Sequence, residues 1–189
     1  MAVRRLPAGS LARLARAFLG AVEDAGTARL MRALGAARRR GHLTPRELEA
    51  VCRWKSARAI HHVRANTRAA VRGATRAALA ARDEGRRMEA LLALRGVSVP
   101  MASALLTLLR PRRYAVIDIR VWQLLHRAGA VRANARGAGF TVGQWREFLL
   151  VVRGLAARLG ATPRAVERAL FEVHRAHQHG TLYPPRPQP

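Results

Sequence analysis

Apolar residues along the chain recur mainly every three or four positions, the spacing of one face of an α-helix. Leu11, Leu14 and Phe18 follow this spacing near the start of the chain, and Leu48, Val51 and Cys52 repeat it further along. Segments that alternate polar and apolar residues are almost absent, and no repeat of solenoid length is visible. The pattern therefore predicts an all-α protein with about nine short helices.

Capping signals set the expected ends of these helices. Thr44-Pro45-Arg46-Glu47 combines an N-cap, a proline at the first helical position and a glutamate at the third, and Thr141-Val142-Gly143-Gln144 is a second capping box. Gly129 to Gly139 is expected to be a loop. With the short pieces counted separately, the expected helices span about residues 10–18, 30–35 or 30–40, 45–54, 57–64, 67–81, 84–94, 98–109, 118–127, 141–159 and 162–177.

The composition is that of a globular protein with a strong positive charge. Half of the 189 residues are hydrophobic, 24% are charged, and the net charge is +24. Such a charge predicts attraction to polyanions, chiefly nucleic acid. The excess is nearly all arginine, because Lys55 is the only lysine. Arginine together with abundant alanine is also what a GC-rich genome produces, so the charge alone leaves nucleic-acid binding open.

Cysteine content and hydropathy exclude several classes of protein. A single cysteine, Cys52, rules out an internal disulfide and a four-cysteine metal or iron–sulfur site. No apolar run reaches the length of a membrane span, and Arg13 and Arg16 interrupt the apolar stretch that a signal peptide would need. We therefore expect a cytoplasmic, nucleoid-associated protein with no membrane contact.

The stretch from Leu94 to Leu106 predicts two helices joined by a very short hairpin. Gly96 can take the left-handed conformation that ends the first helix, Ser98 can cap the second, and Pro100 is tolerated in the first helical turn. The amides of such a turn favour an anion, and a phosphodiester is the anion that so basic a chain would meet. An ordinary turn between two helices of a bundle is the alternative.

Asp118, within the segment from Val116 to Trp122, is the only acidic residue between Glu89 and Glu147. The same interval carries nine arginines. One carboxylate on a basic surface suits an enzyme that acts on a nucleic-acid sugar, because it can stabilise positive charge that develops there. The alternative interpretation is that Asp118 is only an N-cap of the next helix, which contributes about 1 kcal/mol.

Two linked motifs resemble the helix–hairpin–helix DNA glycosylase superfamily. Residues 94–106 are similar to its Leu-Pro-Gly-Val-Gly hairpin followed after two residues by Ala, and 116–121 to the Val-Asp-Thr-His-Val segment that supplies its catalytic aspartate. Pro100 precedes Asp118 by 18 residues, as in the endonuclease III and adenine-glycosylase branches. The resemblance covers residues 84–127 well and the flanks loosely. Ser56-Ala57-Arg58-Ala59 also resembles the family's Ser-Ala-Gln-Ala segment, which implies that Arg58 wedges into the duplex.

The resemblance implies an all-α glycosylase-like fold, with two small helical lobes and DNA lying across the cleft between them. The hairpin lobe would span residues 44–128, the second lobe 1–43 plus 140–178, and residues 179–189 would form a disordered, proline-rich tail. Asp118 would be the catalytic residue on the floor of the cleft. The expected DNA-binding hairpin comprises Arg95, Gly96, Val97, Ser98 and Pro100, and the expected phosphate contacts are Arg110, Arg112 and Arg113.

Aromatic residues and histidines complete the candidate site. Tyr114 is expected to stack on bases because basic loop residues surround it, whereas Trp122 could line the base pocket or belong to the core. Trp54 and Trp145 are expected in the core. His174, His177 and His179 have metal-like spacing, but histidines near a helix end also interact with the helix dipole, and no metal or other cofactor is expected.

Departures from the family pattern refine the expected activity. Pro100 stands where bifunctional members carry the lysine that forms a Schiff base, so strand cleavage by that lysine is not expected. Lys55, the only side-chain amine, could approach the same cleft. Ser98 replaces the usual second glycine, and the family's iron–sulfur cysteines are absent.

The sequence thus predicts a monofunctional DNA glycosylase that acts on double-stranded DNA as a monomer. A non-catalytic DNA-binding module on the same fold and an α-helical RNA-binding protein are the alternatives. The residues do not identify the lesion.

Overall fold

A computed structural model describes residues 10–176, and within that range every regular element is helical and no strand occurs. The predicted all-α class is confirmed, although the helices are more numerous and shorter than expected. The elements are α1 Ser10–Phe18, α2 Ala25–Ala33, α3 Gly35–Arg40, α4 Pro45–Ser56, the 3-10 helix η1 Ala57–Ala59, α5 Ile60–Arg64, α6 Arg68–Ala80, α7 Glu84–Leu92, α8 Val99–Leu109, α9 Ile119–Arg127, α10 Val142–Leu159 and α11 Pro163–Ala176.

Side-chain caps explain where the longest and the most central helices begin. At the start of α4 the Thr44 Oγ1 accepts a hydrogen bond from the Glu47 amide, and Glu47 Oε2 accepts one from the Thr44 amide. Thr141 and Gln144 form the same reciprocal pair at the start of α10. Both capping boxes predicted from the sequence are confirmed, because the signal and the structure it specifies are local.

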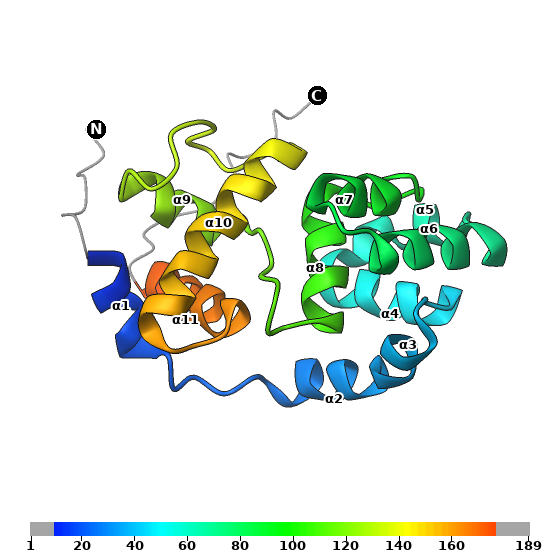
Figure 1. Cartoon of the computed structure of the whole chain (residues 1–189), viewed down its shortest axis with the longest axis horizontal. Helices are drawn as coiled ribbons and strands as arrows, with labels where there is room; N and C mark the ends of the chain where they lie inside the picture. Colours follow the sequence, from blue (N-terminus) through cyan, green and yellow to red (C-terminus); the bar gives the residue numbers. More distant parts are fainter. Residues whose placement is uncertain (1–9, 177–189) are drawn as a thin grey trace, which may run out of the picture.

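Helix α8 lies in the middle of the molecule (Figure 1). Ten of its eleven residues are buried, and it packs against α2, α3, α4, α7 and α10. This helix is apolar on all sides, which is the pattern of a helix surrounded by others. The hairpin at its start and the segment after its end are therefore attached to a helix that is almost completely buried.

The other helices gather on two sides of α8 (Figure 1). Helices α2 to α7 lie on one side, whereas α1, α9, α10 and α11 pack against one another on the other. The predicted division at residues 43 and 128 differs from these contacts, because α2 and α3 pack on α4 and α8, and α9 packs on α11. Burial of Leu34 and Ala37 on the one side and of Trp122 and Leu125 on the other accounts for the difference. One cluster of buried residues runs through both groups.

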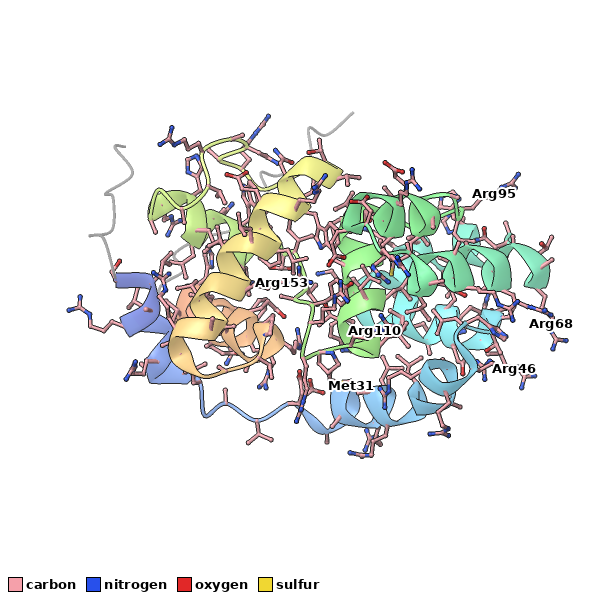
Figure 2. The ribbon with its side chains drawn as sticks, in the orientation of Figure 1. Met31, Arg46, Arg68, Arg95, Arg110 and Arg153 are labelled. Carbon is pink, nitrogen blue, oxygen red and sulfur yellow. The ribbon has the colours of Figure 1, made fainter. Side chains whose placement is uncertain are left out.

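Glu84 of α7 joins the two groups of helices. Its carboxylate accepts hydrogen bonds from Arg153 of α10 at 2.9 Å, from Arg113 at 3.1 Å and from the Tyr114 hydroxyl at 2.9 Å. Figure 2 shows Arg153 between α10 and α8. Burial alone would raise the pKa of Glu84, but the hydrogen bonds from Arg153, Tyr114 and Arg113 outweigh it and hold the pKa below its ordinary value.

No helix within residues 10–176 is long and apolar enough to cross a membrane.

Candidate functional site

Asp118 is the N-cap of α9, as predicted. Its Oδ1 accepts a hydrogen bond from the Arg120 amide at 2.9 Å, and its Oδ2 lies 3.1 Å from Lys55 Nζ. The two side chains retain 21% and 17% of their exposure, so the carboxylate is accessible and is not sealed in the core. The capping bond fixes the orientation of the carboxylate, and the ammonium group of α4 lies at its other oxygen.

The extended segment 114–117, which leads to Asp118, is buried and held by side chains from two helices. The Ile117 amide donates to Ser103 Oγ of α8 at 3.1 Å, and the Val116 amide donates to Glu167 Oε2 of α11 at 3.4 Å. Ser103 Oγ in turn donates to the Pro100 carbonyl at 2.8 Å. Ser103 therefore ties the segment that positions Asp118 to the first turn of the hairpin helix.

Gly96 takes the left-handed conformation that the sequence predicted, with φ of +78°, but it lies within the turn between α7 and α8. It does not end the first helix as expected, because α7 ends at Leu92 with Ala93 as its C-cap. A Cβ at this position would lie 2.9–3.0 Å from atoms of His62 and Val63 in α5, so the turn also needs the space that glycine leaves. Asn66 holds the preceding residue, Arg95, because its side chain accepts from the Arg95 amide and donates to the Arg95 carbonyl, each at 2.9 Å.

Ser98 occupies the N-cap position of α8, but its side chain forms no capping hydrogen bond, which corrects the expected role of its hydroxyl. Pro100 lies in the first turn of α8, as predicted. Val97 is buried under the turn, whereas Ser98 and Arg95 are exposed. The turn therefore presents its polar groups outward and its apolar residue inward.

A hollow of about 300 Å³ opens beside the hairpin, and we call it the hairpin hollow. The hairpin contributes Ser98 and Pro100 to it, and the η1 turn contributes the exposed Arg58. The loop between α9 and α10 forms a further wall. Its lining residues are Lys55, Ser56, Arg58, Ser98, Pro100, Met101, Ile117, Asp118, Ile119, Gly137, Ala138, Gly139 and Phe140.

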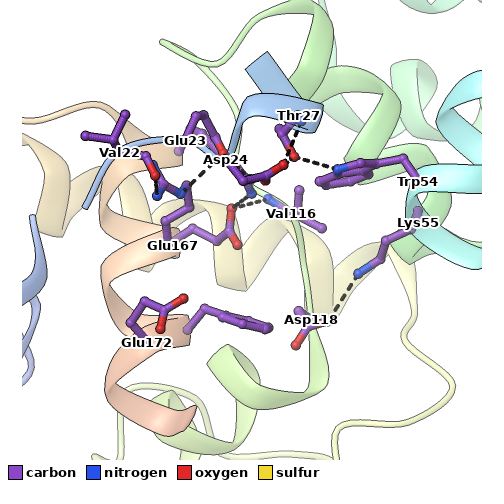
Figure 3. Close-up of a pocket in the computed structure, with 13 residues that line it drawn as sticks. Val22, Glu23, Asp24, Thr27, Trp54, Lys55, Val116, Asp118, Glu167 and Glu172 are labelled. Carbon is purple, nitrogen blue, oxygen red and sulfur yellow. Dashed lines mark hydrogen bonds and ion pairs between the residues drawn. The ribbon is translucent and has the colours of Figure 1, made fainter. Parts of the chain in front are cut away.

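A second hollow, of about 430 Å³, lies between α4, the segment before α9, and α11 (Figure 3). We call it the Trp54 hollow. Figure 3 shows Lys55 and Asp118 meeting at one end of it, with Trp54 and Thr27 toward the other. Its lining residues are Val22, Glu23, Asp24, Thr27, Trp54, Lys55, Val116, Asp118, Arg164, Glu167, Arg168, Phe171 and Glu172.

Trp54 is half-buried and lines this hollow, whereas the sequence predicted that it lies in the core. Its indole nitrogen donates to Thr27 Oγ1 at 2.8 Å, and Thr27 Oγ1 donates to Asp24 at the N-cap of α2. The Arg164 guanidinium lies 5.7 Å from the centre of the indole ring. These contacts fix the ring as a wall of the hollow.

Five of the eleven acidic residues of this +24 chain line the Trp54 hollow, namely Glu23, Asp24, Asp118, Glu167 and Glu172. Arg164 pairs with both Glu23 and Glu167, and Arg168 pairs with Glu23. Burial raises the pKa of Glu167 above its ordinary value, although the charge of Arg164 opposes that shift. The five carboxylates outnumber the three cations of the lining, Lys55, Arg164 and Arg168. This balance makes the hollow less favourable for a phosphate group than the rest of this basic protein's surface.

Only Lys55 and Asp118 are charged residues that line both hollows. The carboxylate of Asp118 is thus accessible from the side of the hairpin and from the side of Trp54. A nucleotide displaced from a strand at the hairpin could place its sugar at Asp118 and its base in the Trp54 hollow.

The three predicted phosphate contacts lie away from this site. Arg110, Arg112 and Arg113 follow the C-terminal end of α8, about 16 Å along the helix from the hairpin at its N-terminal end. Figure 2 shows Arg110 beside the lower part of α8 and Arg95 at the upper right of the molecule. Arg110 donates to the Leu79 carbonyl, and Arg113 pairs with Glu84. The prediction grouped these arginines with the hairpin because they are close to it in sequence. In the fold, the whole length of α8 separates the two.

Tyr114 does not form a stacking platform for bases, contrary to the sequence-based expectation. Its ring is fully buried against Trp145, with the ring centres 6.3 Å apart, and its hydroxyl donates to Glu84. Arg113 and Arg153 lie over the ring at 5.6 and 5.3 Å. The neighbouring basic residues cover the ring because they pair with Glu84. Burial raises the pKa of Tyr114, and the charge of Glu84 adds to that shift.

Trp122 belongs to the core, the second of its two predicted roles. The side chain is fully buried, and its indole nitrogen donates to the Asn134 carbonyl at 2.8 Å. Phe140, which packs edge-on against it at 5.3 Å, lines the hairpin hollow instead. Trp145 is buried, as expected.

Of the histidines with metal-like spacing, His177 and His179 lie outside the described residues, as does the tail 179–189. His174 is buried, and one ring nitrogen contacts Gln123 Oε1 at 3.2 Å. Burial lowers the pKa of His174, and the nearby Arg127 and Arg120 lower it further. Among residues 10–176, no group of three or more His, Cys, Asp or Glu side chains is arranged to hold a metal ion.

Comparison of the chain with models of protein families, with curated proteins and with solved structures gives no match.

Proposed function

We propose that the protein is a monofunctional DNA glycosylase, which hydrolyses the N-glycosidic bond of a nucleotide displaced from double-stranded DNA. The observation that carries the proposal is the position of Asp118, at the point where the hairpin hollow and the Trp54 hollow meet. We further propose that the protein acts as a monomer and that its DNA substrate lies in the cytoplasm.

The two hollows differ in the chemistry that they favour. The hairpin hollow has Arg58 and the turn before α8 on its rim, which suit the phosphates of a DNA strand. The Trp54 hollow has an indole wall, Phe171 and several carboxylates, and its volume of about 430 Å³ is typical of a small-molecule pocket. A base is therefore favoured in the Trp54 hollow and the charged backbone is favoured outside it, which is the arrangement that base displacement requires.

Asp118 has the chemistry for the hydrolytic step. Cleavage of an N-glycosidic bond develops positive charge on the sugar, and a fixed carboxylate beside the sugar stabilises that charge or orients the attacking water. The Arg120 amide and the Ser103-anchored segment hold this carboxylate in place before DNA binds. Preorganisation of this kind reduces the rearrangement needed in the transition state.

The resemblance of the hairpin and the Asp118 segment to the glycosylase superfamily supports the same proposal. Pro100, in place of the Schiff-base lysine, favours base release without strand cleavage. Arg58 lies on the rim of the hairpin hollow, where a side chain could occupy the place of the displaced nucleotide. Arg95, on the exposed side of the turn, is available to a phosphate.

The test is a set of duplexes that each carry one alkylated, deaminated or oxidised base, incubated with the wild-type protein and with Asp118→Asn. The expected result is an abasic strand from at least one substrate with wild type and none with Asp118→Asn. Failure to release any of these bases, or equal release by the two proteins, would contradict the proposal.

A non-catalytic DNA-binding module is the second candidate, and the contacts of Asp118 favour it. Both carboxylate oxygens already have partners, the Arg120 amide and Lys55, as in a purely structural cap. This candidate predicts salt-sensitive duplex binding that Asp118→Asn leaves unchanged, with no abasic product from any substrate. An RNA-binding protein would instead bind RNA more tightly than duplex DNA of equal length at moderate salt.

A further inference from the structure

The loop between α9 and α10, residues 128–141, has a defined structure although it contains no helix. Asn134 organises it from a left-handed conformation with φ of +55°. Its side-chain Nδ2 donates to the Ala138 carbonyl at 2.9 Å, and its side-chain Oδ1 accepts from the Ala138 amide at 3.3 Å. The Asn134 carbonyl also accepts the indole N–H of Trp122. The loop is therefore fixed to α9, the helix that Asp118 caps.

Two arginines of this loop have anchored backbones and exposed side chains. Gln123 Nε2 donates to the Arg136 carbonyl at 3.0 Å, and a His126 ring nitrogen lies 3.2 Å from the Arg132 carbonyl. Both guanidinium groups are exposed, and neither forms an ion pair with any of residues 10–176. Residues 128–141 include no acidic residue. The loop thus presents two positive charges on a fixed backbone.

The same loop forms one wall of the hairpin hollow, with Gly137, Ala138, Gly139 and Phe140. The hairpin and Arg58 lie on other sides of the hollow. Gly137 packs closely, because a Cβ there would lie 3.2 Å from Trp122 and 3.3 Å from Ile119. Gly139 has φ of +63°, and a Cβ there would meet nothing within 4 Å. The backbone at Gly139 therefore borders open space on the rim of the hollow, where another backbone can approach closely.

We propose that the loop 128–141 is a second DNA-backbone contact, which binds the strand on the side of the displaced nucleotide opposite the hairpin. Arg132 and Arg136 bind phosphates, and Gly139 is the point of closest approach. A strand whose displaced sugar is at Asp118 would run out of the hairpin hollow past Ser98 in one direction and past Gly139 in the other. The hairpin would then contact the backbone on the first side, and the loop 128–141 would contact it on the second. The choice of DNA as partner rests on the proposed function.

The first test measures how duplex affinity depends on salt, with a duplex that carries one central tetrahydrofuran abasic analogue. The double variant Arg132→Ala/Arg136→Ala is compared with wild type and with Arg68→Ala/Arg72→Ala, which removes the same charge from exposed positions of α6 on the other side of the molecule (Figure 1). Because each phosphate contact contributes about 0.9 to the slope of log affinity against log salt concentration, the loop variant should lose about 1.8 of slope. The α6 variant should keep the wild-type slope. Equal slopes for the two variants would overturn the inference.

A second test locates the contacts by phosphate ethylation interference on the same duplex. Wild type should show interfering phosphates on both sides of the analogue, and the loop variant should lose those on one side only. Arg58→Ala/Arg95→Ala should lose those on the other side. An unchanged pattern with the loop variant overturns this inference and leaves the proposed function intact, whereas failure of wild type to bind any duplex overturns both.

Discussion

At the scale of single residues, the site is defined by a carboxylate whose two oxygens have different partners. Oδ1 of Asp118 binds the amide of its own helix, and Oδ2 binds the ammonium of the only lysine in the chain. Arginine cannot deprotonate in proteins, so Lys55 is the only side-chain cation near Asp118 that could act as a nucleophile. Lys55 Nζ is instead held in an ion pair with the Asp118 carboxylate, at 3.1 Å.

We therefore expect Lys55 to form no covalent adduct with an abasic strand. Duplex with a preformed abasic site is incubated with wild type at neutral pH in borohydride, which would reduce an imine to a stable adduct. The expected result is no adduct and an uncut strand, as for monofunctional action. An adduct that disappears in Lys55→Arg would show that Lys55 is a nucleophile and that the activity is bifunctional.

Ser103 is the residue that couples the hairpin helix to the position of Asp118. Ser103→Ala leaves the Ile117 amide and the Pro100 carbonyl without their buried partner. The expected cost is about 1–3 kcal/mol in the free energy of unfolding, measured by urea denaturation, together with slower base release.

The control for Ser103 is Thr107→Val on the same helix. The Thr107 hydroxyl donates to the backbone carbonyl of Ser103 and not to the segment that leads to Asp118. The variant removes a buried hydroxyl without touching the Asp118 segment. Base release that falls equally in both variants would contradict a positioning role for Ser103.

At the scale of elements, the hairpin depends on a turn that only glycine fits. Gly96→Ala combines an unfavourable φ of +78° with contacts of 2.9–3.0 Å to α5. We expect a loss of about 1–3 kcal/mol in the free energy of unfolding and weaker duplex binding.

Gly154→Ala in α10 is the matched control, because this glycine is exposed and a Cβ there meets nothing within 4 Å. It should be neutral or should stabilise the protein by about 0.5–1 kcal/mol, since alanine is the better helix former. Equal stability of the two variants, measured by thermal or urea unfolding, would show that the turn tolerates a side chain.

Features of the fold that rest on local signals could be predicted from the sequence. The helix starts at Thr44, Asp118 and Thr141 are predicted correctly, because each cap involves residues within three positions of one another. The packing of α2 and α3 on α8 could not be predicted, because it depends on which distant helices bury Leu34 and Ala37.

The candidate site shows the same limit. The spacing of the motifs reveals Asp118 and the hairpin. The Trp54 hollow instead depends on residues of α2 and α4 that meet residues of α11 over one hundred positions later in the chain. Tyr114 was misassigned because its neighbours in sequence are basic, although Glu84, its partner in the fold, lies 30 residues away. The proximity of Lys55 to Asp118 was raised only as an alternative, since 63 residues separate them.

At the scale of the whole molecule, Glu84 links the two groups of helices and should make stability depend on pH. Its pKa in the folded protein lies below its ordinary value of 4.5. The stabilisation is therefore complete above about pH 4.5 and is lost as the pH falls through the lowered pKa. We expect Glu84→Gln to reduce the loss of unfolding free energy between about pH 5 and pH 3, measured by urea denaturation.

Glu89→Gln is the control for Glu84, because Glu89 is exposed on the same helix and forms no ion pair with residues 10–176. Its pH dependence should follow that of wild type. A Glu84→Gln variant that also follows wild type would show that the cluster of arginines does not stabilise the contact between α7 and α10.

The whole molecule also separates its charges. A chain with a net charge of +24 places five of its eleven carboxylates, Asp118 among them, around one hollow. A polyanion is attracted to the surface in general but not into that hollow. In the proposed function, this separation lets the protein bind a strand at its surface and accept a base, rather than a phosphate, beside Asp118.

The most direct measurement is the single-turnover rate of base release at saturating DNA, for wild type and Asp118→Asn on the best substrate of the lesion set. In the proposed mechanism the carboxylate acts only in the transition state, so the variant should bind the duplex as wild type does and release the base at least about 100-fold more slowly. Equal rates at equal binding would contradict the account, because Asp118 would then be only the cap of α9.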